Sequence, residues 1–428
     1  MRHVWWLVVT MLVPRALIAQ TPSAAFESPE LLGYVRQVLE GNAAYRAAGS
    51  RLAAATERIA TAGALPDPIF TTGVVATPVP SFSFTAERMT RVSIGIRQSF
   101  PFPGKLGAAT AVARADSARG SEIVGAVEAD LVAAAVGAYY ALAHAGTALQ
   151  VWQARQTLAD QAVQVAQARY ETGAVPLTDL LRARLRRAEL EEKRRQLEAD
   201  LVAARARLDA LRGGRADTVV PQPLLRADGG AALVVWDDSL VPDTTLLQRL
   251  AMTSPALLVA AAEVERAGRR ARVFAIAARP DFTVSLDNGI RFGGREPFLT
   301  VLVGISVPLW AGRKQAPAAR AARLDVDDAR QRYDDLLARL TGEVVSSVAA
   351  LEALQSRIQQ THGEIIPLAG AASTSALQRY RVGAVSFTTV LDTQDDLFDA
   401  QLRLARLIAD YGAARARLAA LVGEEWYR

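Results

Sequence analysis

The chain repeats itself at a fixed offset of 210 residues, and this repeat limits its possible folds more than any other feature. Residues 169–175 read RYETGAV, and residues 379–385 read RYRVGAV. Aligned without gaps, 168–214 and 378–424 share 19 identities in 47 positions. A repeat of this length indicates that one supersecondary unit is built twice, so we expect two halves with the same order of elements.

Each half is predicted to contain a helix, two strands, a long helix, a tight turn and a returning helix. Alternating and helical periodicities set the approximate limits of these elements. The first half is predicted to have helix 28–63, strands 69–77 and 89–100, long helix 105–172 and return helix 177–212. The second half is predicted to have helix 244–278, strands 281–292 and 298–307, long helix 313–382 and return helix 387–422.

The first residues are typical of a secretory signal. Arg2 and His3 precede an apolar stretch from Val4 to Val13, and small residues up to Ala19 suggest a cleavage point. Between the halves, a segment rich in Gly, Pro and Asp reads as a connector. The predicted organisation is a signal at 1–19, a first repeat at 20–212, a connector at 213–243 and a second repeat at 244–428.

Composition excludes several classes of protein. The chain has no cysteine, so an exported form has neither disulfides nor a lipid-modified N-terminal cysteine. The formal charge of +5 falls to +3 when Arg2 and Arg15 leave with the signal, and no basic block stands out, so nucleic-acid binding is not indicated. Although 51% of residues are hydrophobic, we find no apolar run after the N-terminus that reaches the roughly 18–20 residues of a spanning helix, which disfavours a helical membrane protein.

The predicted strands alternate between apolar and polar residues. Phe282, Val284 and Leu286 share one face, while Thr283 and Ser285 occupy the other. This pattern is typical of a transmembrane β-barrel with lipid outside and a polar lumen inside. Taken alone, however, the strands favour the alternative of an antiparallel sheet on a soluble core.

Helix length favours a conduit. At about 1.5 Å per residue, 105–172 spans roughly 100 Å, and each return helix covers about half of that. We expect 177–212 to stack end to end on 244–278, and 387–422 on 28–63. Because four strands cannot close a membrane barrel, several chains would have to pool them.

The chain resembles the TolC-like outer-membrane efflux proteins over essentially its whole mature length. The resemblance rests on the duplication, the RY-x-x-G turns at 169–173 and 379–383, and the segments FPFPGK (100–105) and PLWAGR (308–313) that precede the long helices. It implies a mainly α-helical homotrimer. Its twelve pooled strands would form one barrel in the outer membrane of a Gram-negative bacterium, continued by an α-helical barrel into the periplasm. The implied partners are a periplasmic adaptor and an inner-membrane pump of RND type.

The resemblance also suggests a cargo. LPDP (65–68) with FPFPGKL (100–106) is similar to the heavy-metal cation efflux branch, although drug-exporting branches share parts of both motifs. A passive exit duct for heavy-metal cations, or else for drugs, is therefore the expected function. The competing interpretation is a periplasmic helical-hairpin adaptor, which the duplication and the strand pairs disfavour.

The turns between long and return helices are candidate adaptor contacts. Gly173 and Gly383 suit a helix C-terminus that needs a positive φ, and this structural role explains them in part. By resemblance, the same tips meet the adaptor's helical hairpin. The residues expected there are Gly173, Ala174, Val175 and Thr178 in the first half, and Gly383, Ala384, Val385 and Thr388 in the second.

Four residues beside the second turn are candidate gate residues. Asp392 and Asp395 open the last helix, where acids also favour the positive end of the helix dipole. Under threefold symmetry, an inward acid becomes a ring that attracts cations. The resemblance places an inward gate acid at Asp392. Arg379 and Tyr380 precede the turn, and they either hold the gate shut or pack the tip.

From the sequence we expect no enzymatic activity, no cofactor and no metal site. The three histidines, His3, His144 and His362, are isolated from one another, and there is no cysteine to join them.

Overall fold

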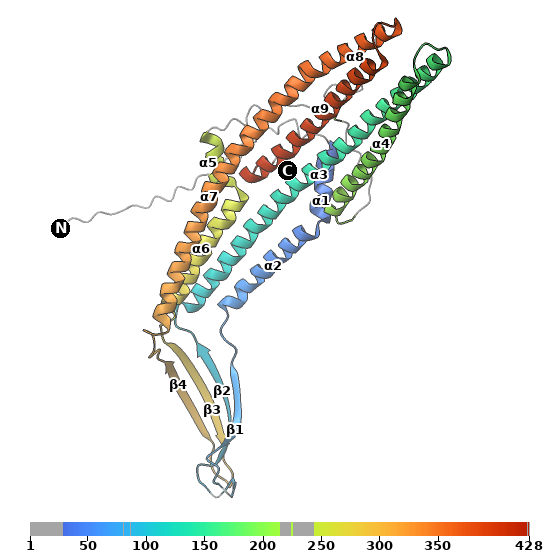
Figure 1. The fold of residues 1–428 in the computed structure, drawn as a ribbon. Helices are drawn as coiled ribbons and strands as arrows, with labels where there is room; N and C mark the ends of the chain where they lie inside the picture. The colour runs from blue at the N-terminus through green and yellow to red at the C-terminus, as the bar shows by residue number, and fades with distance from the viewer. Residues whose placement is uncertain are drawn as a thin grey trace, which may run out of the picture.

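The computed structural model shows an elongated molecule with strands at one end and helical tips at the other (Figure 1). It describes residues 29–79, 81–85, 87–214, 224–225, 244–425 and 427. The signal predicted at 1–19 and most of the connector predicted at 213–243 lie outside these residues.

The same order of elements occurs in both halves. The first half contains α1 (Pro29–Gly41), α2 (Ala43–Gly63), β1 (Ile69–Val75), β2 (Arg91–Phe100), α3 (Lys105–Glu171) and α4 (Leu177–Leu211). The second half contains α5 (Thr244–Thr253), α6 (Pro255–Ile276), β3 (Asp281–Ile290), β4 (Phe298–Ser306), α7 (Gln315–Gln360), the π-helix η3 (Thr361–Ile365), α8 (Ile366–Arg381) and α9 (Phe387–Val422).

The helices predicted at 28–63 and 244–278 are each broken in two, so the prediction of single helices was wrong. Asn42 separates α1 from α2, and its side-chain oxygen accepts hydrogen bonds from the backbone N–H groups of Ala44 and Tyr45. This is an N-cap, which starts a new helix. Pro255 begins α6 because its missing N–H is tolerated only in a first turn.

The second long helix, predicted as continuous over 313–382, contains a π-helical turn. The backbone N–H of Ile366 donates to the carbonyl of Thr361, five residues back. Pro367 follows directly and has no N–H for an ordinary helical bond, so the wider turn accommodates its ring. The repeat offset survives, since Lys105–Glu171 and Gln315–Arg381 remain 210 residues apart at both ends.

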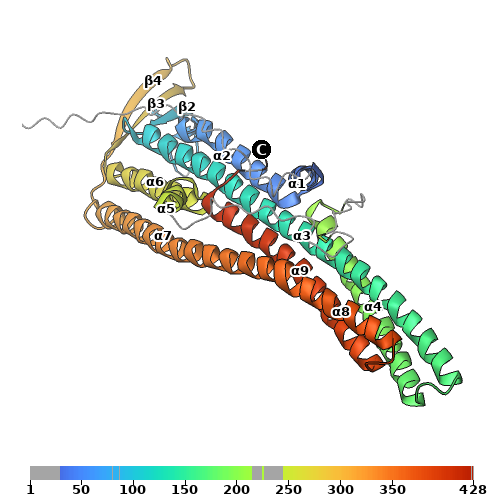
Figure 2. The same ribbon diagram turned by 90° about the horizontal axis from the view of Figure 1, so that it is seen from above.

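The predicted stacking of the half-length helices was wrong in its pairing. The end of α4 meets the α1–α2 junction, where the Tyr34 hydroxyl donates to the Leu208 carbonyl at 3.2 Å and the Asn42 amide donates to the Leu211 carbonyl at 3.0 Å. The end of α9 meets the α5–α6 junction through the Thr253 hydroxyl and the Val422 carbonyl at 2.5 Å. Each return helix therefore completes the leg of its own half. The helices lie side by side in the order α2, α3, α6 and α7 in the strand-side half (Figure 2).

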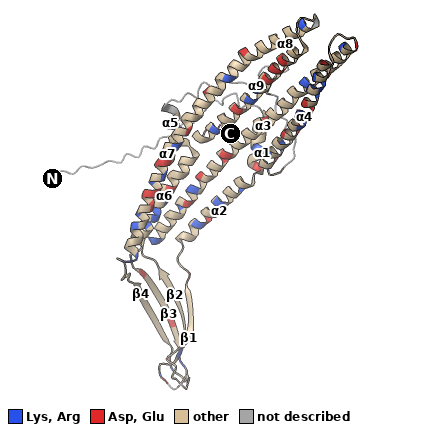
Figure 3. Ribbon diagram, viewed as in Figure 1, with Lys and Arg blue, Asp and Glu red and all other residues tan. Residues whose placement is uncertain are grey.

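The strands form one antiparallel sheet in the order β1-β2-β3-β4. Leu286 pairs with Val301 on one face, whereas Asp287 pairs with Thr300 on the other, as the alternation predicted. Charged residues are sparse along the strands and frequent along the helices (Figure 3). Lys105 and Asp281 join the two halves at the base of the sheet, with 2.9 Å between ammonium and carboxylate.

The main core lies in the middle of the molecule, where α1 and α5 pack onto the long helices. Tyr34 of α1 stacks on Tyr139 of α3 with ring centroids 6.4 Å apart. Among the described residues, α3 is the one helix long and apolar enough to cross a membrane. Val132, Val136 and Leu142 of this helix are buried in the core.

Position 412 of α9 has no room for a side chain, because the ring of Tyr140 packs directly against Gly412. A Cβ added at Gly412 would lie 2.4 Å from that ring, which is itself buried. We expect Gly412→Ala to lower the free energy of unfolding by about 1–3 kcal/mol through overpacking. Gly137→Ala is the matched control, because its Cβ meets nothing within 4 Å and helix propensity favours alanine by up to about 1 kcal/mol. Thermal unfolding of the detergent-purified protein, followed by circular dichroism, measures both effects; equal loss in both variants would contradict the packing argument.

Candidate functional site at the helical tips

The two tip turns have the same backbone geometry. Gly173 and Gly383 adopt φ values of +70° and +76°. The N–H of each donates to the carbonyl of a tyrosine three residues before it, Tyr170 or Tyr380. The N–H of the following alanine donates to the carbonyl of Arg169 or Arg379. These bonds satisfy the last carbonyls of each long helix, and glycine is the residue that reaches the positive φ without strain.

Aromatic and cationic side chains join the two hairpins near the tip. The guanidinium of Arg169 lies over the ring of Tyr380, 4.9 Å from its centroid. Tyr380 in turn packs against Phe387 with centroids 5.6 Å apart. Phe387 begins α9, which Ser386 caps by accepting a hydrogen bond from the N–H of Thr389. The first hairpin (α3–α4) and the second hairpin (α8–α9) therefore meet through Arg169 and Tyr380.

The predicted tip residues lie on the surface of both turns. The side chains of Ala174, Thr178, Ala384 and Thr388 are exposed or half-buried, and those of Val175 and Val385 are half-buried. The Thr388 hydroxyl lies 2.6 Å from that of Ser386. An uncovered surface at both turns is what a docking tip requires.

The predicted gate residues divide into two groups. Tyr380 and Asp395 contact other side chains, Tyr380 through the tip packing described above, whereas Asp392 and Arg379 are exposed. Neither Asp392 nor Arg379 has an ion-pair partner in the part of the chain that the structure describes. Asp395, by contrast, is engaged by two arginines, so it is not a free carboxylate in this arrangement.

An ion cluster around Arg155 ties three helices together below the tip. Arg155 of α3 is buried, and its guanidinium pairs with Asp395 and, at 3.3 Å, with Asp399, both on α9. Arg186 of α4 pairs with the other oxygen of Asp395. We call Arg155, Arg186, Asp395 and Asp399 the clamp.

Aromatic rings cover the buried guanidinium of the clamp, that of Arg155. The guanidinium of Arg155 lies 4.7 Å from the ring centroid of Trp152 and 5.8 Å from that of Phe398. Cation–π contacts of this kind strengthen as water is excluded. Burial lowers the pKa of Arg186, but its bonds to Glu189 and Asp395 raise that pKa overall, so Arg186 stays charged.

Sequence reasoning missed Arg155 and Arg186. The available signal was an arginine at 155 that ends an uncharged run, three residues after Trp152, in a helix predicted to be closely packed. Its partners lie more than 200 residues away, so spacing alone could not connect them.

Comparison with known proteins settles the family. The outer membrane efflux protein family matches residues 34–214 and 246–424, which is most of the chain and both repeats. The chain belongs to this family. It is also similar to the cobalt-zinc-cadmium resistance protein CzcC of Cupriavidus metallidurans, with 25% identity over 97% of this chain and 98% of that protein.

Solved structures show the same fold. The outer-membrane channel OprN superposes with a TM-score of 0.78 at 21% identity, covering 94% of this chain and 92% of that one. The outer membrane protein VceC of Vibrio cholerae gives a TM-score of 0.76 at 19% identity, covering 94% and 99%. The predicted fold, a helical barrel with a β-barrel part, is therefore confirmed.

Family membership decides between the two functions weighed from the sequence. The protein is an outer-membrane efflux channel that extends into the periplasm, and the alternative of a periplasmic adaptor is wrong. Proteins of the family are trimeric channels that work with periplasmic adaptors and inner-membrane pumps.

Proposed function

We propose that this protein is the exit duct of a heavy-metal cation efflux system driven by an RND-type pump. The observation that carries the cargo is the full-length similarity to a cobalt-zinc-cadmium resistance protein. The LPDP and FPFPGKL segments at 65–68 and 100–106 support the same branch.

The chain acts as a homotrimer in this proposal. β1 and β4 are the outer strands of the sheet, and each has an open edge. Open edges are not tolerated in lipid, so β1 of one chain pairs with β4 of the next and three sheets close a twelve-stranded barrel. The threefold rotation that pairs these strand edges also places α2 and α4 of one chain against α7 and α8 of its neighbour.

The tips bind the adaptor and form the gate. The exposed turns at 173–178 and 383–388 present the docking surface. Asp392 lies eighteen residues, about five full turns, before Asp410, so both lie on one face of α9. Asp410 lines an open groove on that face. A ring of three Asp392 carboxylates would attract cations at the entrance.

A deletion of the gene tests the cargo. We expect the strain to become sensitive to cobalt, zinc and cadmium, with little change toward dyes, detergents and antibiotics, and the intact gene to restore growth. Sensitivity confined to drugs and detergents would keep the duct and overturn the metal cargo.

Gly383→Trp tests the tip. A tryptophan at φ +76° is strained and projects from the docking surface, so we expect complementation to fail although the trimer reaches the outer membrane. Gly294→Trp is the matched control, with φ +70°, open space around its Cβ and a position in the β3–β4 loop at the opposite end. Normal complementation by Gly383→Trp would overturn the assignment of this turn as a contact site.

A further inference from the structure

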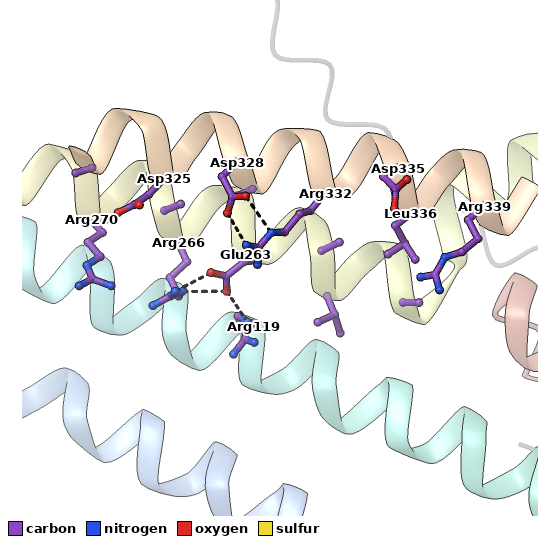
Figure 4. Close-up of a pocket in the computed structure, with 16 residues that line it drawn as sticks. Arg119, Glu263, Arg266, Arg270, Asp325, Asp328, Arg332, Asp335, Leu336 and Arg339 are labelled. Carbon is purple, nitrogen blue, oxygen red and sulfur yellow. Dashed lines mark hydrogen bonds and ion pairs between the residues drawn. The ribbon is translucent and has the colours of Figure 1, made fainter. Parts of the chain in front are cut away.

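Three grooves open on one face of the helical layer. The first, about 600 Å³, lies between α6 and α7 and includes Arg119 of α3 (Figure 4). The second, about 1040 Å³, lies over α3 beside α4 and α9. The third, about 510 Å³, lies between α7 and α9.

All three grooves face away from the central core. Gly137 and Ala141 line the second groove, and each is two residues from Tyr139, which packs on α1. Two residues correspond to about 200° around a helix, so the groove and α1 lie on opposite sides of α3. Arg119 precedes Asp130 by eleven residues, about three turns, which places the first groove on the same face as the second.

This face lines the bore, an assignment that rests on the trimeric duct proposed above. A ring of helices has one inner and one outer face. The short helices α1 and α5 pack against the core on one face and would obstruct the bore if that face were the inner one. The grooves therefore lie inside.

The groove walls carry more positive than negative charge. Nine guanidinium groups and six carboxylates line them, a surplus of three positive charges per chain. Glu263 is neutralised by Arg119 at 2.7 Å and Arg266 at 2.6 Å. Within the described chain, Arg270 and Arg339 have no acidic partner.

Burial raises the pKa of Asp130, which does not reduce the positive surplus, and two other titratable groups in the grooves leave the balance unchanged. Burial on its own would raise the pKa of Glu263, but hydrogen bonds from Arg266 and the charges of Arg266 and Arg119 lower it overall, so Glu263 stays ionised. Burial and the charge of Arg406 lower the pKa of His144, so this histidine is neutral at pH 7.

We propose that this arginine-rich wall gives the open bore a preference for small anions over small cations. A surface potential of one sign raises the local concentration of the opposite ion. The wall of one chain also has no metal-binding site of three or more ligands, since the described residues contain no group of three or more His, Asp or Glu that could hold a metal ion. A cation delivered by the pump would pass with its counter-anions, and external cations would be disfavoured from entering.

The ion selectivity of the purified trimer in planar bilayers tests this. Asp396 is exposed and lies one helical turn after Asp392 on α9. Both tip acids are first neutralised by Asp392→Asn with Asp396→Asn, so that they do not set the selectivity. In a KCl gradient between about 0.1 and about 0.01 M, where screening lengths are about 10 to 30 Å, we expect a reversal potential that shows chloride favoured over potassium by about two- to fourfold.

A charge swap on the wall makes the test specific. In the same tip-neutralised protein, Arg270→Glu with Arg339→Glu changes the surplus from +3 to −1 per chain, so the preference should invert to potassium. Arg323→Glu with Arg330→Glu is the matched control. These residues lie two positions before the groove residues Asp325 and Arg332 and thus on the other side of α7, so the chloride preference should persist.

A potassium preference in the tip-neutralised protein, or equal shifts in both double variants, would overturn this inference and leave the duct intact. Failure to form any channel would overturn the proposed duct, and the inference with it.

Discussion

Replacing Arg155 with alanine is expected to release the tip of α9 and leave the channel leaking at rest. The substitution removes the positive charge that both Asp395 and Asp399 contact, and it empties a buried site between Trp152 and Phe398. Arg155 is buried, but the side chains of Asp395 and Asp399 are 28% and 63% exposed, so we expect a cost of about 1–3 kcal/mol, between that of a surface pair and that of a fully buried pair. Since about 1.4 kcal/mol corresponds to a factor of ten, the clamped arrangement should lose about one to two orders of magnitude in relative population.

The leak can be measured in two independent ways. Purified trimers in planar bilayers should show a raised resting conductance, and cells should become sensitive to antibiotics too large to cross the outer membrane. Arg187→Ala is the control. Arg187 also pairs across α3 and α4, with Asp160 at 2.7 Å, but its side chain is 59% exposed, and exposed pairs contribute about 0–1 kcal/mol. A folded Arg155→Ala trimer with unchanged conductance would show that the clamp supports the fold without closing the tip.

The repeat made the order of elements and the positions of the turns predictable. The motif RY-x-x-G occurs in both halves at a fixed offset, and a glycine directly after a long helix is expected to end that helix with a positive φ. The two breaks at Asn42 and Pro255 were missed because each depends on a single residue inside a strongly periodic segment. The π-turn before Pro367 was missed for the same reason.

Contacts between distant segments were much less predictable. Stacking was assigned from helix lengths, and because both halves have nearly equal lengths, the two possible pairings fit equally well. The hydrogen bonds of Tyr34 and Thr253 decide between them, and they depend on three-dimensional positions. The clamp was missed similarly: Asp395 was noticed as an acid at a helix start, but the arginines that engage it come from two other helices.

Val301→Arg should prevent assembly in the outer membrane. Val301 lies in the middle of β4 and pairs with Leu286 on the apolar face of the sheet, where its side chain is 61% exposed in the single chain. An arginine on the lipid face of a barrel costs about 2–4 kcal/mol near the bilayer midplane, and a trimer carries three copies. We therefore expect loss of the trimer from outer-membrane fractions.

The neighbouring residue provides the control, because adjacent residues of a strand point to opposite faces. Thr300 pairs with Asp287 on the polar face, so Thr300→Arg places a guanidinium in the lumen beside a carboxylate, and the trimer should assemble normally. Both substitutions add the same side chain at nearly the same depth, which leaves the facing direction as the variable. If Thr300→Arg alone failed to assemble, the two faces would be inverted; if both variants assembled, β4 would not contact lipid at this depth.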